Sequence, residues 1–313
     1  MAVNLNKYQQ ITKNIGLIAD GTNVGVIQTE NGIILVDAGG TSETGKAIME
    51  TVHQFFPDKE ITGIFLTHAH TDHVGGLTYI LEHCNPTVYA GKVTASFLEV
   101  PQATAMIYAG GKPCKEMRTT EFLMDIPVKT DFILEENISI DIGGISVRTI
   151  DLPGHCPGMT GFIFSDNEAG KKVFFLGDAF FGMKMLKKIW IPFILDPAEF
   201  RDSVMKIEQT NADFFIPGHG EVCTIETAGC VAEHNIMITY EFEDLILKLI
   251  KSGCNEISRI LESTANYAGM KLKATNYYLI MTTLKSYMAS LEEEEQIESY
   301  MENNALLWRL KNE

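Results

Sequence analysis

The chain has 313 residues, of which 45% are hydrophobic and 21% charged, so it can bury a large core and does not resemble a disordered protein. Its formal net charge of −16 opposes binding to a nucleic-acid backbone, because that affinity comes mainly from Lys and Arg residues that displace counterions. No apolar stretch of about 18 residues occurs, so no membrane span is expected.

The cysteines and the N-terminal sequence bear on the compartment. Six cysteines are scattered along the chain without a Cys-x-x-Cys pair, and the first residues lack the apolar run of a signal peptide. In a chain of this length such cysteines favour reduced thiols over a disulfide framework. We therefore expect a cytoplasmic protein.

The first part of the chain predicts strands joined by a tight turn. Two apolar runs, residues 24–29 and 33–36, flank an Asn-Gly pair, which is a strong hairpin signal. A helix is expected to begin near residues 41–42, because apolar residues then recur on one helical face. A short buried strand at residues 61–66 leads directly into the His-rich segment at 67–73.

The same arrangement recurs further along the chain. Strands predicted at 145–150, 173–176 and 214–216 are followed closely by His155, Asp178 and His219. The first of these strands forms a hairpin with residues 138–142, and a helix is expected from Asp196 to about Gln209. Binding groups commonly lie at the carboxyl ends of strands, where loops converge over a rigid sheet. This order of elements predicts sheets covered by helices.

After about residue 233 the pattern changes to helical periodicity. Apolar residues recur at helical spacing between residues 242 and 261, and residues 278–291 form another apolar-rich helix candidate. The segments around Ile297 and residues 306–310 predict a short two-stranded wing. Residues 239–313 are therefore interpreted as a small helical, winged-helix-like appendage.

The motif His68-Ala-His70-Thr-Asp72-His73 places four good metal ligands within six residues. Neutral imidazole and carboxylate suit Zn²⁺, with Fe and Mn as alternatives. His68 and His70 point the same way in an extended stretch, whereas Asp72 and His73 follow the bend and can face a second ion. The chain has only 8 histidines, so three within six residues are a poor match to a chance polar loop.

His155, Asp178 and His219 are each weak signals when taken alone. A single His is more often a core or surface residue than a ligand, and Asp178 and His219 both fit a simple turn at a strand end. Their shared position directly after predicted strands favours metal ligation for all three. Cys156, next to His155, is interpreted as a small packing residue, because the metals already supply the nucleophile.

The ordered motifs resemble the metallo-β-lactamase superfamily of hydrolases. They are Asp37, His68-x-His70-x-Asp72-His73, His155, Asp178 and His219, which occur in this order between about residues 10 and 225. The resemblance implies an α/β fold, a four-layer αβ/βα sandwich of two mixed sheets with helices outside. Residues 1–238 would form this metal-binding catalytic domain, and residues 239–313 the appendage.

The resemblance also implies a role for each residue. His68, His70 and His155 would hold the first metal; Asp72, His73 and His219 would hold the second; Asp178 would bridge both; and Asp37 would steady the metal-binding loop from behind. Asp72, the Gly-His-Cys stretch and Asp178 are similar to the glyoxalase-II and lactonase branches of the superfamily.

These expectations predict a dinuclear-metal-dependent hydrolase that acts on a small molecule and needs no organic cofactor. Two metals about 3.5–4 Å apart can share a water and convert it to hydroxide, which would attack a thioester, ester or lactone carbonyl. Asp72 and Asp178 would act catalytically by holding the metals. Neither would be a free general acid, which favours leaving groups that depart without strong protonation.

Two other activities on the same fold stay open. Iron-dependent persulfide oxidation needs two His and one carboxylate with open positions, and metal analysis would distinguish it. Phosphodiester cleavage would use the appendage to grip nucleic acid, but residues 239–313 hold 8 Lys+Arg against 12 Asp+Glu, a net charge of 8 − 12 = −4. A homodimer is also left open, with the appendage either completing a dimer interface or covering the site.

Two segments are candidates for the wall of a substrate pocket. Residues 94–129 carry several Met and aromatic residues and predict either a hydrophobic lid or an ordinary peripheral helix pair. Residues 183–190 follow Asp178 closely and are the second candidate. Their lysines could meet an anionic substrate, but a solvated charge run is the simpler interpretation.

Overall fold

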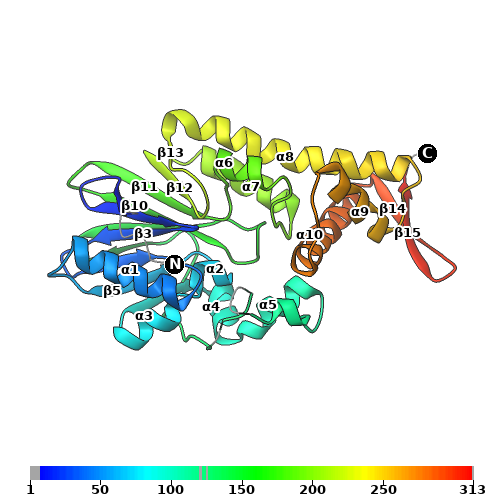
Figure 1. Cartoon of the computed structure of the whole chain (residues 1–313). Helices are drawn as coiled ribbons and strands as arrows, with labels where there is room; N and C mark the ends of the chain where they lie inside the picture. Colours follow the sequence, from blue (N-terminus) through cyan, green and yellow to red (C-terminus); the bar gives the residue numbers. More distant parts are fainter. Residues whose placement is uncertain (1–7, 120–121, 125, 312–313) are drawn as a thin grey trace.

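The computed structural model describes residues 8–119, 122–124 and 126–311, which form two mixed β-sheets packed face to face between layers of helices (Figure 1). In the described residues, the first sheet has the strand order β1 (Tyr8–Gln10), β2 (Ile15–Asp20), β3 (Thr22–Gln28), β4 (Ile33–Val36), β5 (Ile61–Leu66), β6 (Thr87–Gly91) and β7 (Phe132–Leu134). The second sheet has the order β13 (Cys223–Thr224), β12 (Phe214–Pro217), β11 (Lys171–Gly177), β10 (Thr160–Asp166), β9 (Ile145–Asp151) and β8 (Ser139–Ile142).

Helices cover the outer face of each sheet (Figure 1). Those that follow strands of the first sheet are α1 (Ser42–Phe55), α2 (Thr71–Val74), α3 (Leu77–His83), α4 (Lys92–Glu99), α5 (Pro101–Ala109) and the short 3₁₀ helix η2 (Lys115–Met117). Those that follow strands of the second sheet are α6 (Met183–Lys188), α7 (Pro197–Glu208) and α8 (Ile225–Lys251). The chain continues through α9 (Ile257–Tyr267), α10 (Ala274–Glu293) and the hairpin β14 (Ile297–Glu302) and β15 (Ala305–Leu310).

The layers are held together by separate clusters of buried apolar side chains. Phe65 of β5, Phe162 of β10 and Phe175 of β11 belong to the cluster between the two sheets. Ile48 of α1 and Leu77 of α3 belong to a second cluster, on the outer face of the first sheet. This layering confirms the predicted αβ/βα sandwich.

Helix starts and hairpins follow the sequence signals. The Thr41 hydroxyl accepts a hydrogen bond from the Thr44 backbone N–H and caps α1, and the Asp196 carboxylate does the same for Glu199 at the start of α7. Strands β3 and β4 pair antiparallel, as do β8 and β9. These predicted elements are confirmed.

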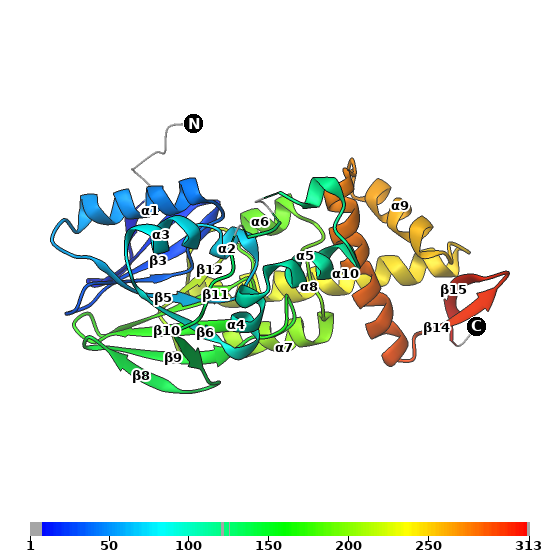
Figure 2. The same ribbon diagram turned by 90° about the horizontal axis from the view of Figure 1, so that it is seen from below.

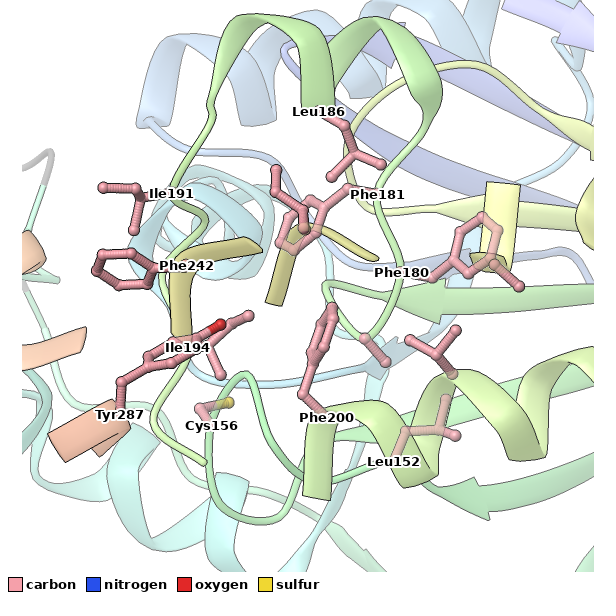
Figure 3. Packing of buried hydrophobic residues seen from close by; sticks show 14 of the residues in the cluster. Leu152, Cys156, Phe180, Phe181, Leu186, Ile191, Ile194, Phe200, Phe242 and Tyr287 are labelled. Carbon is pink, nitrogen blue, oxygen red and sulfur yellow. The ribbon is translucent and has the colours of Figure 1, made fainter. Parts of the chain in front are cut away.

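The C-terminal elements share a buried cluster with the second sheet. This cluster runs from Phe174 of β11 through Phe200 and Phe242 to Tyr287 of α10, and Figure 3 shows the last three side chains. Helix α8 is continuous from Ile225 to Lys251, so the division predicted between residues 238 and 239 falls inside it. The helical periodicity begins earlier than the apolar pattern indicated, and the two-domain division stays a prediction.

The predicted two-stranded wing is present as the antiparallel hairpin β14–β15, at the end of the molecule away from the sheets (Figure 2). Within the parts of the chain that the structure describes, no helix combines the length and the apolar character needed to cross a membrane.

Candidate metal centre

Loops from both sheets converge at one edge of the sandwich. Asp37 follows β4, His68 and His70 follow β5, His155 follows β9, Asp178 follows β11 and His219 follows β12. Strands β4 and β5 are parallel neighbours in one sheet, and β11 and β12 in the other, so their carboxyl ends open on a common edge. The structure thereby brings together all seven side chains that the sequence predicted as metal ligands.

The first group of ligand atoms belongs to His68, His70 and His155. These atoms, together with the Cys156 Sγ, all lie within 4.8 Å of one another. The Nδ1–H of His155 donates to the Phe193 carbonyl at 2.7 Å, which leaves the lone pair of a neutral ring at Nε2, 2.7 Å from the Nδ1 of His70. We call these three histidines the first cluster.

The first cluster is buried and uncharged at neutral pH. Burial lowers the pKa of His68, and the neighbouring His73 lowers it further. Burial also lowers the pKa of His70 and of His155. Neutral imidazole is the form that binds a metal ion, so this cluster needs no proton loss to accept one.

The second group consists of Asp72, His73, Asp178 and His219, whose ligand atoms also lie within 4.8 Å of one another. The His73 Nε2 is 3.3 Å from the Asp178 Oδ1. The His219 Nε2 is 3.0 Å from the Asp72 Oδ2 and 3.5 Å from the Asp178 Oδ2. We call these four residues the second cluster.

Asp178 lies between the two clusters. Its Oδ2 is 3.6 Å from the Nε2 of His155, in the first cluster, while both of its oxygens face histidines of the second. Burial opposes ionisation of this carboxyl, but the charges of His219 and His73 hold its pKa well below the usual value. The position matches the bridging role that the resemblance implied.

Charge distinguishes the second cluster from the first. Burial alone would lower the pKa of His73, but Asp178, Asp72 and Asp37 raise it well above the usual value. Burial also lowers the pKa of His219. The charge of Asp178 and the hydrogen bond to Asp72 outweigh this effect and raise the pKa to about 9. In the second cluster, negatively charged carboxylates therefore lie against positively charged imidazoles.

Buried ligand atoms that make no hydrogen bond show whether these residues fit metal ions. Among the described residues, the buried His68 Nε2, His73 Nε2 and Asp178 Oδ1 have no hydrogen-bond partner. Buried polar atoms are nearly always hydrogen-bonded, so these three atoms, two of which form only the 3.3 Å ion pair between His73 and Asp178, are in place to bind metal ions. Imidazole nitrogens and carboxylate oxygens are the donor set that Zn²⁺, Fe or Mn takes, so the residues fit two divalent cations.

Gly218 lies against Asp178 and His73 of the second cluster. A Cβ at this position would lie 2.2 Å from the Asp178 Oδ1 and 2.6 Å from the Cε1 of His73. Only glycine lets the His219 loop pass this close to the bridging carboxylate. The sequence showed Gly218 as part of a strand-end turn, and its role in shaping the site was missed.

Asp37 lies behind the two clusters and is hydrogen-bonded to residues of both ligand loops. Its carboxylate accepts hydrogen bonds from the Thr67 N–H at 2.9 Å and from the Nδ1–H of His73 at 2.8 Å. The Thr67 hydroxyl donates to the same carboxylate and lies 3.0 Å from the Nδ1 of His68. One buried carboxylate therefore orients a histidine of each cluster.

The β2–β3 turn holds the last ligand loop, which sequence reasoning missed. The His219 Nδ1–H donates to the Gly21 carbonyl at 2.8 Å, leaving its Nε2 free to face the second cluster. The side-chain amide of Asn23 donates to the carbonyls of Pro217 and Gly220. These contacts span almost 200 positions of sequence, and no local pattern signals them.

Cys156 is buried beside the first cluster. Burial, followed by the charges of Asp178 and Asp72, raises the pKa of the thiol well above its usual value. The protonated thiol is a weak metal ligand and a poor nucleophile, in agreement with the interpretation of Cys156 as a packing residue.

A cavity of about 330 Å³ opens over the two clusters. Besides ligand residues, it is lined by Thr71, Tyr108, Phe122, Phe181, Met185, Leu186, Ile189, Pro192, Phe193 and Leu279. Both segments proposed as pocket walls thus contribute, although residues 120, 121 and 125 of the first lie outside the described residues. The lysines of α6 are exposed and do not line the cavity, so their interpretation as a solvated charge run is confirmed.

Comparison with known proteins agrees with this geometry. The family model described as the metallo-beta-lactamase superfamily matches residues 17–219. The chain belongs to the metallo-β-lactamase superfamily. In this superfamily, the chain is similar to the hydroxyacylglutathione hydrolase GloC of Haemophilus influenzae, with 27% identity over 154 residues, 49% of this chain and 63% of GloC.

Other members are similar over different lengths. The (R)-specific secondary-alkylsulfatase of a Pseudomonas species is 35% identical over 74 residues, 24% of this chain and 11% of the sulfatase. The chain thus covers less than two thirds of the length of these first curated relatives. A solved β-lactamase domain protein from Burkholderia ambifaria aligns over 97% of this chain and 94% of its own, with a TM-score of 0.74 and 15% identity, which establishes a shared fold.

Proposed function

We propose that this chain is a hydrolase that uses two divalent metal ions to cleave a thioester, ester or lactone bond of a small molecule. The observation that carries the proposal is the pair of clusters that meet at Asp178, with three buried ligand atoms that make no hydrogen bond. Zn²⁺ is the expected metal, with Fe and Mn as alternatives, because the donors are imidazole and carboxylate.

The protein supplies the geometry of the reaction. The first cluster would hold one cation and the second cluster the other, with Asp178 shared between them. Two cations in such a site lower the pKa of water and polarise a substrate carbonyl. Asp37, through Thr67 and His73, keeps the ligand imidazoles in fixed orientations before substrate arrives.

The lining of the cavity favours substrates with good leaving groups. The acidic residues among the described lining are Asp72 and Asp178, both engaged in the second cluster. Burial raises the pKa of Tyr108 well above its usual value, so this phenol can donate a hydrogen bond but is a poor proton donor. Thiolates and activated alkoxides leave without strong protonation, whereas an amine does not.

The direct test is a substrate screen of the metal-loaded protein. Thioesters, lactones, activated esters, phosphodiesters and a peptide amide are compared on one preparation, before and after chelation. We expect hydrolysis of the first three classes, loss of that activity with a chelator and recovery on adding Zn²⁺. Cleavage of phosphodiesters alone, or hydrolysis that resists complete metal removal, would overturn the proposal.

A further inference from the structure

The wall of the cavity is apolar around a polar floor. Apart from Thr71 and five residues of the two clusters, every described lining residue is aliphatic, aromatic or Met. No Lys or Arg belongs to this described lining. A negative charge placed against this wall would be desolvated without a cationic side chain to pair with it. The cavity thus disfavours anionic parts of a substrate.

The apolar wall stands over the first cluster. The ring of His70 lies 5.2 Å from that of Tyr108 and 5.6 Å from that of Phe193. The ring of His155 lies 5.8 Å from Phe193 and 6.1 Å from Phe181. Figure 3 shows Phe181 next to Leu186 of α6, both of which line the cavity. This half of the site has an apolar wall, and we call it the dry half.

The second cluster reaches the solvent through two of its four residues, Asp72 and His219. In this cluster the side chain of Asp72 is 51% exposed and that of His219 is 12% exposed, while His73 and Asp178 are buried. All three histidines of the first cluster are buried. The two halves of the site therefore differ in solvent access, and a substrate bound across them has one dry end and one wet end.

The C-terminal helix α10 completes the dry half. Its Leu279 lines the cavity, and its Thr282 hydroxyl donates to the Tyr108 carbonyl of α5 at 2.9 Å. The next residue, Thr283, accepts a hydrogen bond from the Ile194 N–H at 3.3 Å, directly after Phe193. Figure 2 shows α10 beside α5. Helix α10 thus fixes two segments of the apolar wall.

We infer that the site selects substrates by an apolar, uncharged acyl group that lies over the first cluster, while the leaving group points to solvent past Asp72 and His219. This inference rests on the proposed function and narrows its substrate class. In the reaction, the water oxygen bonds to the carbonyl carbon and the bond from that carbon to sulfur or oxygen breaks. The products are a carboxylate, a thiol or alcohol, and a proton, so no oxidant or reductant is needed.

Two matched substrate series test the inference on the metal-loaded protein. In the first, the acyl chain of a thioester grows from acetyl to decanoyl on one small neutral thiol. In the second, the acyl group stays acetyl and the thiol carries the growing chain. We expect kcat/KM to rise about fourfold per methylene in the first series until the cavity is filled, and to stay nearly flat in the second. Acetylglutathione, whose leaving group carries charges, should not be hydrolysed with a higher kcat/KM than the neutral acetyl thioester.

A binding measurement separates recognition from turnover. Isothermal titration calorimetry with the straight-chain carboxylates from acetate to decanoate should show affinity that rises with chain length. No hydrolysis of any ester, thioester or lactone by protein loaded with two metals would overturn the proposed function. Hydrolysis with equal slopes in the two thioester series, or with acetylglutathione preferred over the neutral acetyl thioester, would overturn this inference alone.

A substitution at Leu279 tests whether α10 forms part of the binding site for the acyl chain. Leu279→Phe narrows the cavity, so kcat/KM for decanoyl thioester should fall at least about tenfold relative to acetyl thioester. The matched control is Leu306→Phe, at an exposed leucine of β15 outside the cavity, which should leave the chain-length profile of the wild type in place. An unchanged profile in folded, metal-loaded Leu279→Phe would contradict the placement of the acyl group.

Discussion

The two clusters at the edge of the sandwich differ in charge and in exposure to solvent. The first is made of histidines that burial keeps neutral, under an apolar wall. The second combines two carboxylates with histidines whose pKa values those carboxylates raise, and it opens to solvent at Asp72. One site thus holds a dry, uncharged half beside a wet, charged half, joined at Asp178. A hydrolase can use this difference to bind an apolar acyl group on one side and to direct the leaving group to solvent on the other.

The largest effect is expected from the removal of Asp178, the residue that both clusters share. Asp178→Ala should lower metal content in both clusters and reduce kcat by about 10³-fold or more, since about 4 kcal/mol of transition-state stabilisation would be lost. Inductively coupled plasma mass spectrometry and steady-state kinetics measure the two effects. Asp244→Ala, at an exposed aspartate of α8, is the matched control. Two metals retained in Asp178→Ala would show that Asp178 is not the shared ligand.

A substitution at Gly218 should disturb the second cluster and leave the first in place. In Gly218→Ala the new methyl would lie 2.2 Å from the Asp178 Oδ1, so the second cluster must distort while the first stays in place. We expect loss of about one metal per chain and a drop in kcat of about 10²-fold. Gly229→Ala in α8, where the nearest atom would be 3.5 Å away, should keep both metals and the rate. Full metal content in Gly218→Ala would contradict the close packing of Gly218 against Asp178.

The carboxylate behind the clusters should matter less than a ligand. Asp37→Asn weakens the acceptor for the Thr67 hydroxyl, which contacts His68 of the first cluster, and for the Nδ1–H of His73 in the second. Metal affinity, measured by competition with a chromophoric chelator, should fall about 10- to 100-fold for both metals. A loss confined to one metal would show that Asp37 serves a single cluster.

The smallest effect is expected from α10, which reaches only the first cluster. Thr283→Val leaves the Ile194 N–H without its partner, and this amide follows Phe193, whose carbonyl orients His155. The free energy of unfolding should fall by about 1–3 kcal/mol, and kcat/KM by a few-fold. Thr283→Ser keeps the hydroxyl and should restore kcat/KM. If the Ser variant were as slow as the Val variant, the hydrogen bond would not be the cause.

Local sequence patterns were enough to predict the framework of the site. The His68–His73 motif concentrates ligands in one turn, and the other ligands follow short apolar strands, so chain order and strand ends indicated where they meet. The hairpins and the capped helices were predictable for the same reason, because their signals lie within a few residues of the element they specify.

The cavity wall could not be predicted in this way. Phe193 and Leu279 come from segments that carry no metal-ligand motif, and they reach the site through tertiary packing of α10. The boundary placed at residues 238 and 239 fell inside α8, because a helix that packs on two neighbours shows no break in its periodicity. Contacts over long sequence separations, such as His219 with Gly21, leave no local signal.

Metal stoichiometry of the purified protein tests the central claim most directly. Inductively coupled plasma mass spectrometry of the wild-type chain, alongside His70→Ala and His219→Ala, counts the ions held by each cluster. The account predicts two divalent metals per wild-type chain and about one in each variant. A single iron per wild-type chain, or the same metal content in all three proteins, would contradict a dinuclear hydrolytic centre.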